Sequence, residues 1–360
     1  QPDGMGLIGE EVKIFDGNEN DQVTIEGPKM YKRNGWYYVF APAGGVKTGW
    51  QTVLRSKNPF GPYEYKVVMR QGDSPVNGPH QGAWVDTVTG QDWFLHFQDV
   101  YAGGRIVHLQ PMHWENDWPI IGINKPGNDY GEPVMEYTKP DIGKSNSYPV
   151  CEPDTSDDFT SDKLGMQWQW NANPQKDWYE LTGSKLKLNA LDTVPLRPVS
   201  DYRNLLLQKW PAPEFTCVTK MQLSGMENGA LAVEKRDNKY TVRQILGTQY
   251  FDCDMPYTTQ NSNDFELSES DFKDTGKTVT FRYTVKCTGH IDHMELNLPV
   301  KAAPVEELTL ELSFDGKNYE KAFSFASKAG RWVGVKNGIF CAHDNTVKNE
   351  KTGYVLVDSV

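Results

Sequence analysis

The sequence has 360 residues, an aromatic content of 12% and a formal net charge of −11. The acidic excess argues against a nucleic acid or an anionic membrane surface as the partner, because both repel a negatively charged protein. No apolar run approaches the roughly 18 residues that a transmembrane helix needs. Abundant aromatic residues, glycine and proline, without long amphipathic helical patterns, predict an all-β protein with many turns.

The first 125 residues contain two related hairpin patterns. Residues 29–41 predict strand, turn and strand with Asn34-Gly35 at the turn, and residues 82–97 do the same around Thr89-Gly90. The two turn glycines lie 55 positions apart (90 − 35), and a third strand follows each hairpin. A repeat of multi-stranded units near this period predicts β-propeller blades. At roughly 45–55 residues per blade, residues 1–125 have room for two blades and part of another.

Two polar residues occupy equivalent places in this repeat. Glu26 precedes the first hairpin in "IEGP", and His80 precedes the second in "PHQG". The innermost strand of a blade would carry both toward the propeller axis. A glutamate on a rigid backbone at a cleft can act as a general acid. The alternatives are a solvent-exposed glutamate at a strand entry and a hydrogen-bonded core histidine.

Three further residues are candidates for ligand contact. Arg105 opens an apolar strand after two glycines, where it could cap the surface or donate paired hydrogen bonds to ligand hydroxyls. Trp50 and Val46 could form an apolar wall, whereas Trp36 is assigned to the core. The sequence contains no GxSxG, HExxH, P-loop or dinucleotide-binding glycine motif.

The remainder of the chain divides into a linker and a second domain. Residues 126–155 are rich in proline, glycine and polar residues, which predicts a surface linker. Residues 156–360 contain many short strand patterns and an Asp315-Gly316 hairpin turn, which together predict a β-sandwich.

Acidic residues and cysteines raise two smaller questions. Asp157, Asp158 and Asp358 lie near the two ends of the predicted sandwich, where oxygen ligands could hold a structural calcium ion; ordinary surface aspartates are the alternative.

The odd number of cysteines excludes complete internal pairing. We expect buried free thiols, with a single disulfide as the alternative, among Cys151, Cys217, Cys253, Cys287 and Cys341.

Several stretches carry a resemblance to a known family. "IEGPKMYKRNGWYYVFAPAGG", "TVLRSKNPFGPY", "NGPHQGAWVDTVTGQDWFLHFQD" and "GRIVHLQPMHWENDWPIIG" resemble the second half of the catalytic domain of glycoside hydrolase family 43. "DDFTSDKLGMQWQWNANPQKDWYEL", "LSFDGKNY" and "GRWVGVKNGIF" resemble the concanavalin-like C-terminal sandwich of its β-xylosidase and arabinofuranosidase members.

The resemblance implies a function and residue roles. It implies a five-bladed propeller, a bacterial enzyme of xylan degradation, and removal of terminal xylosyl or arabinofuranosyl residues from xylan and arabinoxylan oligosaccharides with inversion. Glu26 matches the family's general acid, His80 a histidine near a central metal or ordered water, and Arg105 a sugar-contacting arginine. Val46 stands where the family commonly has threonine in the sugar pocket. No cofactor is required for this chemistry.

The family's catalytic base and a second, pKa-modulating residue are aspartates in motifs that this sequence does not contain. The expectation is therefore that N-terminal propeller blades of the same protein complete the site. The alternatives are a non-catalytic carbohydrate-binding fragment, with Trp168, Trp170 and Trp178 stacking on sugars, and an inactive, degenerate hydrolase. The first residues do not define a location; an extracellular or periplasmic one is favoured, with the cytoplasm left open.

Overall fold

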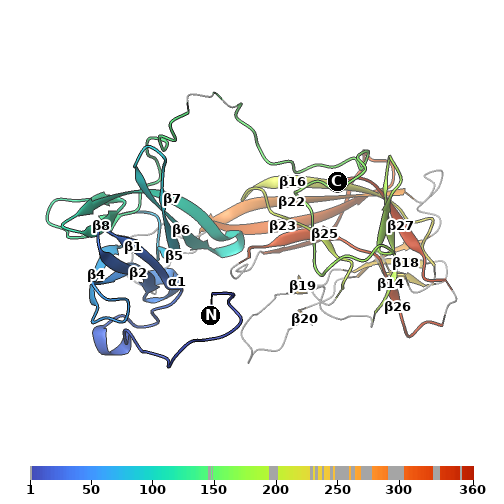
Figure 1. The fold of residues 1–360 in the computed structure, drawn as a ribbon. Helices are drawn as coiled ribbons and strands as arrows, with labels where there is room; N and C mark the ends of the chain where they lie inside the picture. The colour runs from blue at the N-terminus through green and yellow to red at the C-terminus, as the bar shows by residue number, and fades with distance from the viewer. Residues whose placement is uncertain are drawn as a thin grey trace. The chain divides into compact units, whose positions relative to one another are not determined.

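A computed structural model describes most of the chain, and strands dominate it (Figure 1). The described part forms two compact units: one holds the described residues of 2–100 and 105–147, and the other holds Tyr101–Gly104 and the described residues from Pro149 onward. Within the described part, no helix is long and apolar enough to cross a membrane. The described residues are 2–144, 147, 149–193, 202–227, 230–231, 234–236, 239–243, 246–247, 259–260, 264–268, 278–290, 304–326, 333–348 and 351–360.

The first four-stranded blade begins with the predicted hairpin. Asn34 and Gly35 both have positive φ, 49° and 75°, as a tight two-residue hairpin turn requires. A single helical turn, α1 (Gly45–Thr48), connects the second strand to the third. The strands pair antiparallel in chain order: β1 (Lys29–Arg33), β2 (Trp36–Ala43), β3 (Trp50–Ser56) and β4 (Glu64–Met69).

The second blade repeats this architecture. Gly90 supplies the positive φ of its first turn, as the pattern predicts, and Asn116 and Asp117 make a second left-handed turn at its outer edge. A short 3-10 segment, η2 (Tyr101–Gly103), separates the middle strands. The strand order is β5 (His80–Asp86), β6 (Asp92–Val100), β7 (Gly104–Glu115) and β8 (Trp118–Ile121).

Aromatic and cationic side chains join the two blades. Phe40 of β2 stacks on Phe94 of β6 at 5.8 Å between ring centroids, and both side chains are buried. At the outer edge, the Arg55 guanidinium lies 4.6 Å from the Trp36 ring and 3.9 Å from the Trp118 ring. Cation–π contacts of this kind each contribute on the order of 0.5–2 kcal/mol. The blades are therefore neighbours with a shared core.

After the second blade the chain returns to the first. Strands β9 (Ile123–Asn124) and β10 (Gly131–Glu132) pair with each other, and Gly131 of β10 pairs in parallel with Met69 of β4. Because β10 lies inside the predicted 126–155 linker, the first part of that segment adds an edge strand to the first blade. The predicted part of a further blade is not formed in residues 2–28, where the regular element is the 3-10 turn η1 (Asn18–Asn20).

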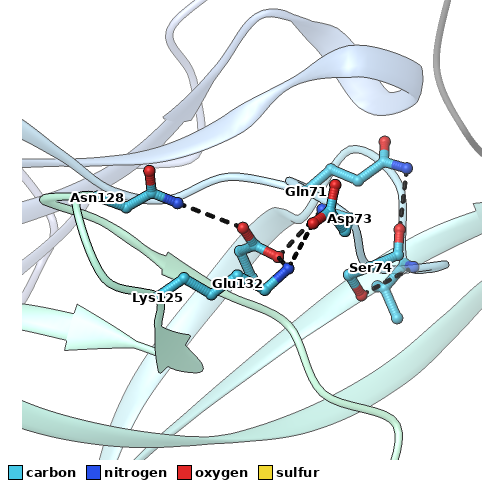
Figure 2. A network of polar contacts seen from close by, with 7 residues as sticks. Gln71, Asp73, Ser74, Lys125, Asn128 and Glu132 are labelled. Carbon is cyan, nitrogen blue, oxygen red and sulfur yellow. Dashed lines mark hydrogen bonds and ion pairs between the residues drawn. The ribbon is translucent and has the colours of Figure 1, made fainter.

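A buried carboxylate fixes the β9–β10 segment against the first blade. Glu132 is 6% exposed, and Figure 2 shows it between Lys125, Asn128 and the backbone of Asp73. Lys125 Nζ lies 2.6 Å from Glu132 Oε2, which also accepts the Asp73 N–H at 3.0 Å. Lys125 also pairs with Asp73 and thereby lowers the pKa of that carboxyl. Since both Glu132 oxygens are engaged, this glutamate has a structural role in anchoring the β4–β5 connection.

The second unit is the predicted β-sandwich, and Asp315-Gly316 forms the predicted turn between β23 and β24. Its largest sheet is antiparallel, in the order β12 (Tyr179–Leu181), β13 (Leu186–Asn189), β27 (Tyr354–Ser359), β16 (Phe215–Gln222), β22 (Thr278–His290), β23 (Pro304–Ser313) and β24 (Glu320–Ala326). A second sheet contains β11 (Gln169–Trp170), β15 (Leu206–Lys209) and β25 (Lys336–Ile339). Smaller sheets contain β14 (Leu191–Thr193), β17 (Glu234–Arg236), β18 (Lys239–Arg243), β19 (Leu246–Gly247), β20 (Thr259–Gln260), β21 (Asp264–Ser268) and β26 (Ala342–Asp344).

The sandwich core contains the tryptophans that could have bound sugar. Trp168 and Trp178 are 9% and 4% exposed, and Trp170 packs edge-on against Trp178 at 5.9 Å. The burial of Trp168 and Trp178 leaves little ring face for stacking on a ligand, whereas Trp170 is only partly buried. The described cysteines are free thiols; Cys341 is buried but Cys151 is exposed, and Cys253 lies outside the described residues.

A buried histidine in the second blade makes stability depend on pH. His96 of β6 is 2% exposed and stacks on His108, and burial lowers its pKa to about 4. The unfolded chain, with a histidine pKa near 6.5, therefore takes up the proton first as the pH falls. Stability is fully present above about pH 6.5 and is lost progressively down to pH 4, by roughly 3 kcal/mol at most.

We expect His96→Gln to reduce this loss, as measured by urea unfolding at pH 7.5 and pH 5. The control is His113→Gln, which replaces a half-exposed imidazole of the same blade. An identical loss of unfolding free energy in wild type and His96→Gln would show that His96 does not carry the effect.

Candidate active site

Glu26 lies in the segment that leads into β1, next to the end of β2. Its backbone N–H donates to Pro42 O of β2 at 3.0 Å, which fixes the main chain beside the blade. Its side chain is 48% exposed. Gly27 follows with a φ of 54°, a conformation that glycine adopts without steric cost. The carboxylate is therefore accessible on a backbone held by neighbouring structure.

His80 meets this carboxylate. Its Nε2 lies 2.6 Å from Glu26 Oε1, although the residues are 54 positions apart, and its side chain is fully buried. Burial lowers the pKa of His80, while its hydrogen bond to Glu26 acts in the opposite direction. A neutral imidazole protonated on Nε2 donates to the carboxylate and leaves Nδ1 as an acceptor. The repeat predicted that both residues face the same axis, and the structure brings their side chains into direct contact.

Gln81 joins Arg105 to the same carboxylate. The Gln81 amide nitrogen donates to Glu26 Oε1 at 3.1 Å, and its carbonyl accepts from Arg105 Nη1 at 3.5 Å. The Arg105 guanidinium also lies 4.2 Å from the Phe97 ring. Burial lowers the pKa of Arg105, whereas Asp99 and Glu26 act to raise it. The predicted residues Glu26, His80 and Arg105 thus form one network through Gln81. The sequence analysis did not identify Gln81 as a candidate.

Val46 lies in the α1 turn. The residues that immediately precede β5 contact this turn. Asn77 donates to Lys47 O at 3.0 Å, and a Cβ on Gly78 would lie 2.4 Å from Val46 O. The Val46 backbone is therefore fixed close to the segment that leads into His80. This position is compatible with the predicted place of Val46 in the pocket wall.

Trp50 has structural partners inside the first blade. Its indole N–H donates to Gln22 Oε1 at 2.8 Å, and its ring lies under Gly44, where a Cβ would approach to 2.5 Å. Arg70 covers the ring at 4.8 Å. Among the described residues, no hydrogen bond or ring contact joins Trp50 to Glu26, His80 or Arg105. The structure therefore does not bring Trp50 into the network, and its predicted contact with substrate stays a prediction.

The predicted calcium ligands are occupied by protein groups. Asp358 pairs with Lys185 and, at 3.0 Å, with Lys220, and the two ammonium groups lower its pKa despite the opposing effect of burial. Asp158 Oδ1 accepts hydrogen bonds from Thr160. No group of three or more His, Cys, Asp or Glu side chains suited to a metal occurs in the described part of the chain.

His80 offers a different kind of metal contact. Its Nδ1 is buried without a hydrogen-bond partner among the described residues. A buried lone pair of this kind fits the predicted contact with a central cation or its bound water, because such polar atoms normally have partners. The remaining ligands of that cation would have to come from water or from outside the described residues.

Comparisons with known proteins agree with this architecture of propeller blades followed by a sandwich. The model for glycosyl hydrolases family 43 matches residues 1–119. The model for the beta xylosidase C-terminal concanavalin A-like domain matches residues 156–359, more than half of the chain. The chain belongs to glycoside hydrolase family 43, in the group whose blades are followed by this sandwich. The predicted family and fold class are confirmed.

The similar proteins are mostly longer than this chain. A protein of Xylanibacter ruminicola, provisionally named a beta-xylosidase, is 45% identical over 227 residues, covering 62% of this chain and 41% of that protein. A beta-xylosidase of Formosa agariphila is 30% identical over 397 residues, covering 99% of this chain and 61% of that protein. The chain spans about half the length of these curated relatives.

A solved structure supports the fold across the whole chain. It is an engineered GH43 glycoside hydrolase described as having both endo-xylanase and exo-arabinofuranosidase activity. The two structures align with a TM-score of 0.74 at 22% sequence identity, covering all of this chain and 68% of the other.

Proposed function

We propose that the protein containing this chain hydrolyses glycosidic bonds of xylan-type oligosaccharides, releasing terminal xylosyl or arabinofuranosyl residues with inversion. Membership of glycoside hydrolase family 43 supports this reaction class, as do the beta-xylosidase names of two relatives. The net charge of −11 is compatible with a neutral sugar substrate.

The main support for the proposal is the Glu26 carboxylate, which is fixed by hydrogen bonds on one oxygen and is still exposed to solvent. Oε1 accepts hydrogen bonds from His80 and Gln81, whereas Oε2 forms no hydrogen bond within the described part of the chain. Oε2 is therefore the oxygen that can carry a proton to the leaving oxygen of the substrate. Burial of His80 lowers its pKa, which favours the uncharged imidazole as the group that holds the carboxyl.

Inversion requires a second carboxylate on the opposite side of the sugar, roughly 6.5–9.5 Å from the first, with a water between. We assign this base to an aspartate outside the chain described here, in the additional length that the relatives have. Arg105 would bind substrate hydroxyls through its guanidinium, and Val46 would shape the pocket wall. A cation near His80, when bound, would supply a fixed positive charge at the propeller axis.

The test measures turnover of 4-nitrophenyl β-D-xylopyranoside and 4-nitrophenyl α-L-arabinofuranoside by the complete protein. Proton NMR of the first product is expected to show the anomer inverted relative to the substrate. Retained configuration, or no turnover of either substrate or of xylo-oligosaccharides, would contradict the proposal.

A further inference from the structure

Two consecutive residues, His80 and Gln81, contact the same oxygen of Glu26. This is unusual for a strand, because successive side chains of a regular strand point to opposite faces of the sheet. A regular β5 that directed His80 toward Glu26 would direct Gln81 away from it. A local departure from strand geometry must therefore turn Gln81 back.

A β-bulge provides this departure. His80 pairs with Phe97 and Ala83 with Leu95, so Gln81 and Gly82 together stand opposite a single residue of β6. Gln81 has a φ of 41°, a conformation that side chains other than glycine adopt rarely. Bulges re-aim side chains next to functional sites, and backbone strain of this kind persists where surrounding structure imposes it.

The contacts of Gln81 match the chemistry of an amide. Its NH2 group donates to the carboxylate, and its carbonyl accepts from the guanidinium of Arg105. If the amide were reversed, its carbonyl oxygen would face the Glu26 carboxylate and its NH2 group would face the Arg105 guanidinium. Both contacts would be unfavourable, so these two neighbours determine the orientation of the amide. Gly27 packs closely against this side chain, since a Cβ there would lie 3.2 Å from Gln81 Cγ.

We propose that Gln81 is a positioning residue that orients the Glu26 carboxyl for proton donation and couples it to Arg105. This inference rests on the proposed function of Glu26 as the acid. His80 and Gln81 hold Oε1 from two directions, which leaves Oε2 directed to the leaving oxygen. Without the Gln81 side chain, only the hydrogen bond from His80 would hold the Glu26 carboxyl, and the carboxyl group could change its orientation.

The experiment uses the dependence of the rate on the leaving group in the complete protein. Cleavage of 2,4-dinitrophenyl β-D-xyloside needs little help from an acid, whereas cleavage of xylobiose needs a well-placed proton donor. For Gln81→Ala we expect kcat on xylobiose to fall about tenfold or more, with KM changed less than about threefold. The fall on the dinitrophenyl substrate should be several-fold smaller. The variant Gln81→Met, which is similar in size, lacks the amide donor and adds no charge beside Glu26, should behave in the same way.

A matched control and a folding check separate this role from a structural one. Gln175→Ala removes an exposed glutamine of the sandwich, whose amide donates only to Asn173 O among the described residues, and should leave both rates unchanged. If Gln81→Ala lowers the melting temperature too far for assay, Gln81→Met serves alone. Equal losses on both substrates, or wild-type rates in a folded Gln81 variant, would overturn the inference.

These outcomes differ from a failure of the proposed function itself. If replacing Glu26 leaves activity on xylobiose intact, the acid assignment fails and Gln81 has nothing to position. If Glu26 is required but both Gln81 variants keep wild-type rates, the Gln81 inference alone fails.

Discussion

Replacing Glu26 with glutamine in the complete protein is expected to lower kcat/KM for xylobiose by about 100-fold or more. An amide cannot donate a carboxyl proton to the leaving oxygen, and general acid catalysis contributes about 10²–10⁴-fold to such reactions. Glutamine keeps the shape of the side chain, so binding and folding should change little. Initial rates on xylobiose and on an activated aryl xyloside measure the loss, which should be smaller for the aryl substrate.

Glu115→Gln is the matched control. Glu115 also places Oε1 beside a histidine, at 2.9 Å from His113 Nε2, but both side chains are half-exposed and lie away from the Glu26 network. Its replacement should leave kcat/KM within about twofold of wild type. Full activity in Glu26→Gln would refute the acid assignment.

Gly82→Ala is expected to destabilise the second blade by about 1–3 kcal/mol, through overlap in a packed core. A Cβ at this position would lie 2.1 Å from two ring atoms of Phe94 and 2.3 Å from the Leu95 carbonyl oxygen. Phe94 is fully buried against Phe40, so its ring has little room to yield. The bulge that carries Gln81 would also shift, so activity should fall together with the melting temperature.

Gly90→Ala in the same hairpin is the control, because it introduces backbone strain without steric overlap. Gly90 has a φ of 83°, and a Cβ there would meet nothing within 4 Å, so its replacement should cost only about 1 kcal/mol. Thermal unfolding of both variants measures the difference. A Gly82→Ala protein as stable as Gly90→Ala would show that the β5–β6 packing is looser than the structure indicates.

The features that could be predicted from the sequence are those set by local rules. Asn34-Gly35 and Thr89-Gly90 indicate hairpins because few residues tolerate the positive φ that tight turns require. The repeat then relates Glu26 to His80, because equivalent positions of neighbouring blades face the same axis. That they meet directly, at 2.6 Å between Glu26 Oε1 and His80 Nε2, is a finding of the structure.

Other features depend on partners distant in the sequence. The contact of Gln81 with Glu26 follows from a one-residue shift in the pairing of β5 with β6, which no local pattern indicates. The strand β10 lies in a segment rich in turn residues and forms because Gly131 finds an open edge at Met69. Asp358 appeared suited to calcium, but it pairs with Lys185, just before β13, and with Lys220 of β16.

By itself, the sequence determined the all-β class, the hairpins, the blade repeat and the equivalence of Glu26 and His80 within that repeat, because turn chemistry and residue periodicity are local properties of the chain. Tertiary structure alone decided which oxygen of Glu26 is held, which amide holds it, and whether Trp168 and Trp178 face ligand or core. The physical reason is that side-chain direction at a bulge, and burial between two sheets, depend on strand register and on neighbours far away in the chain.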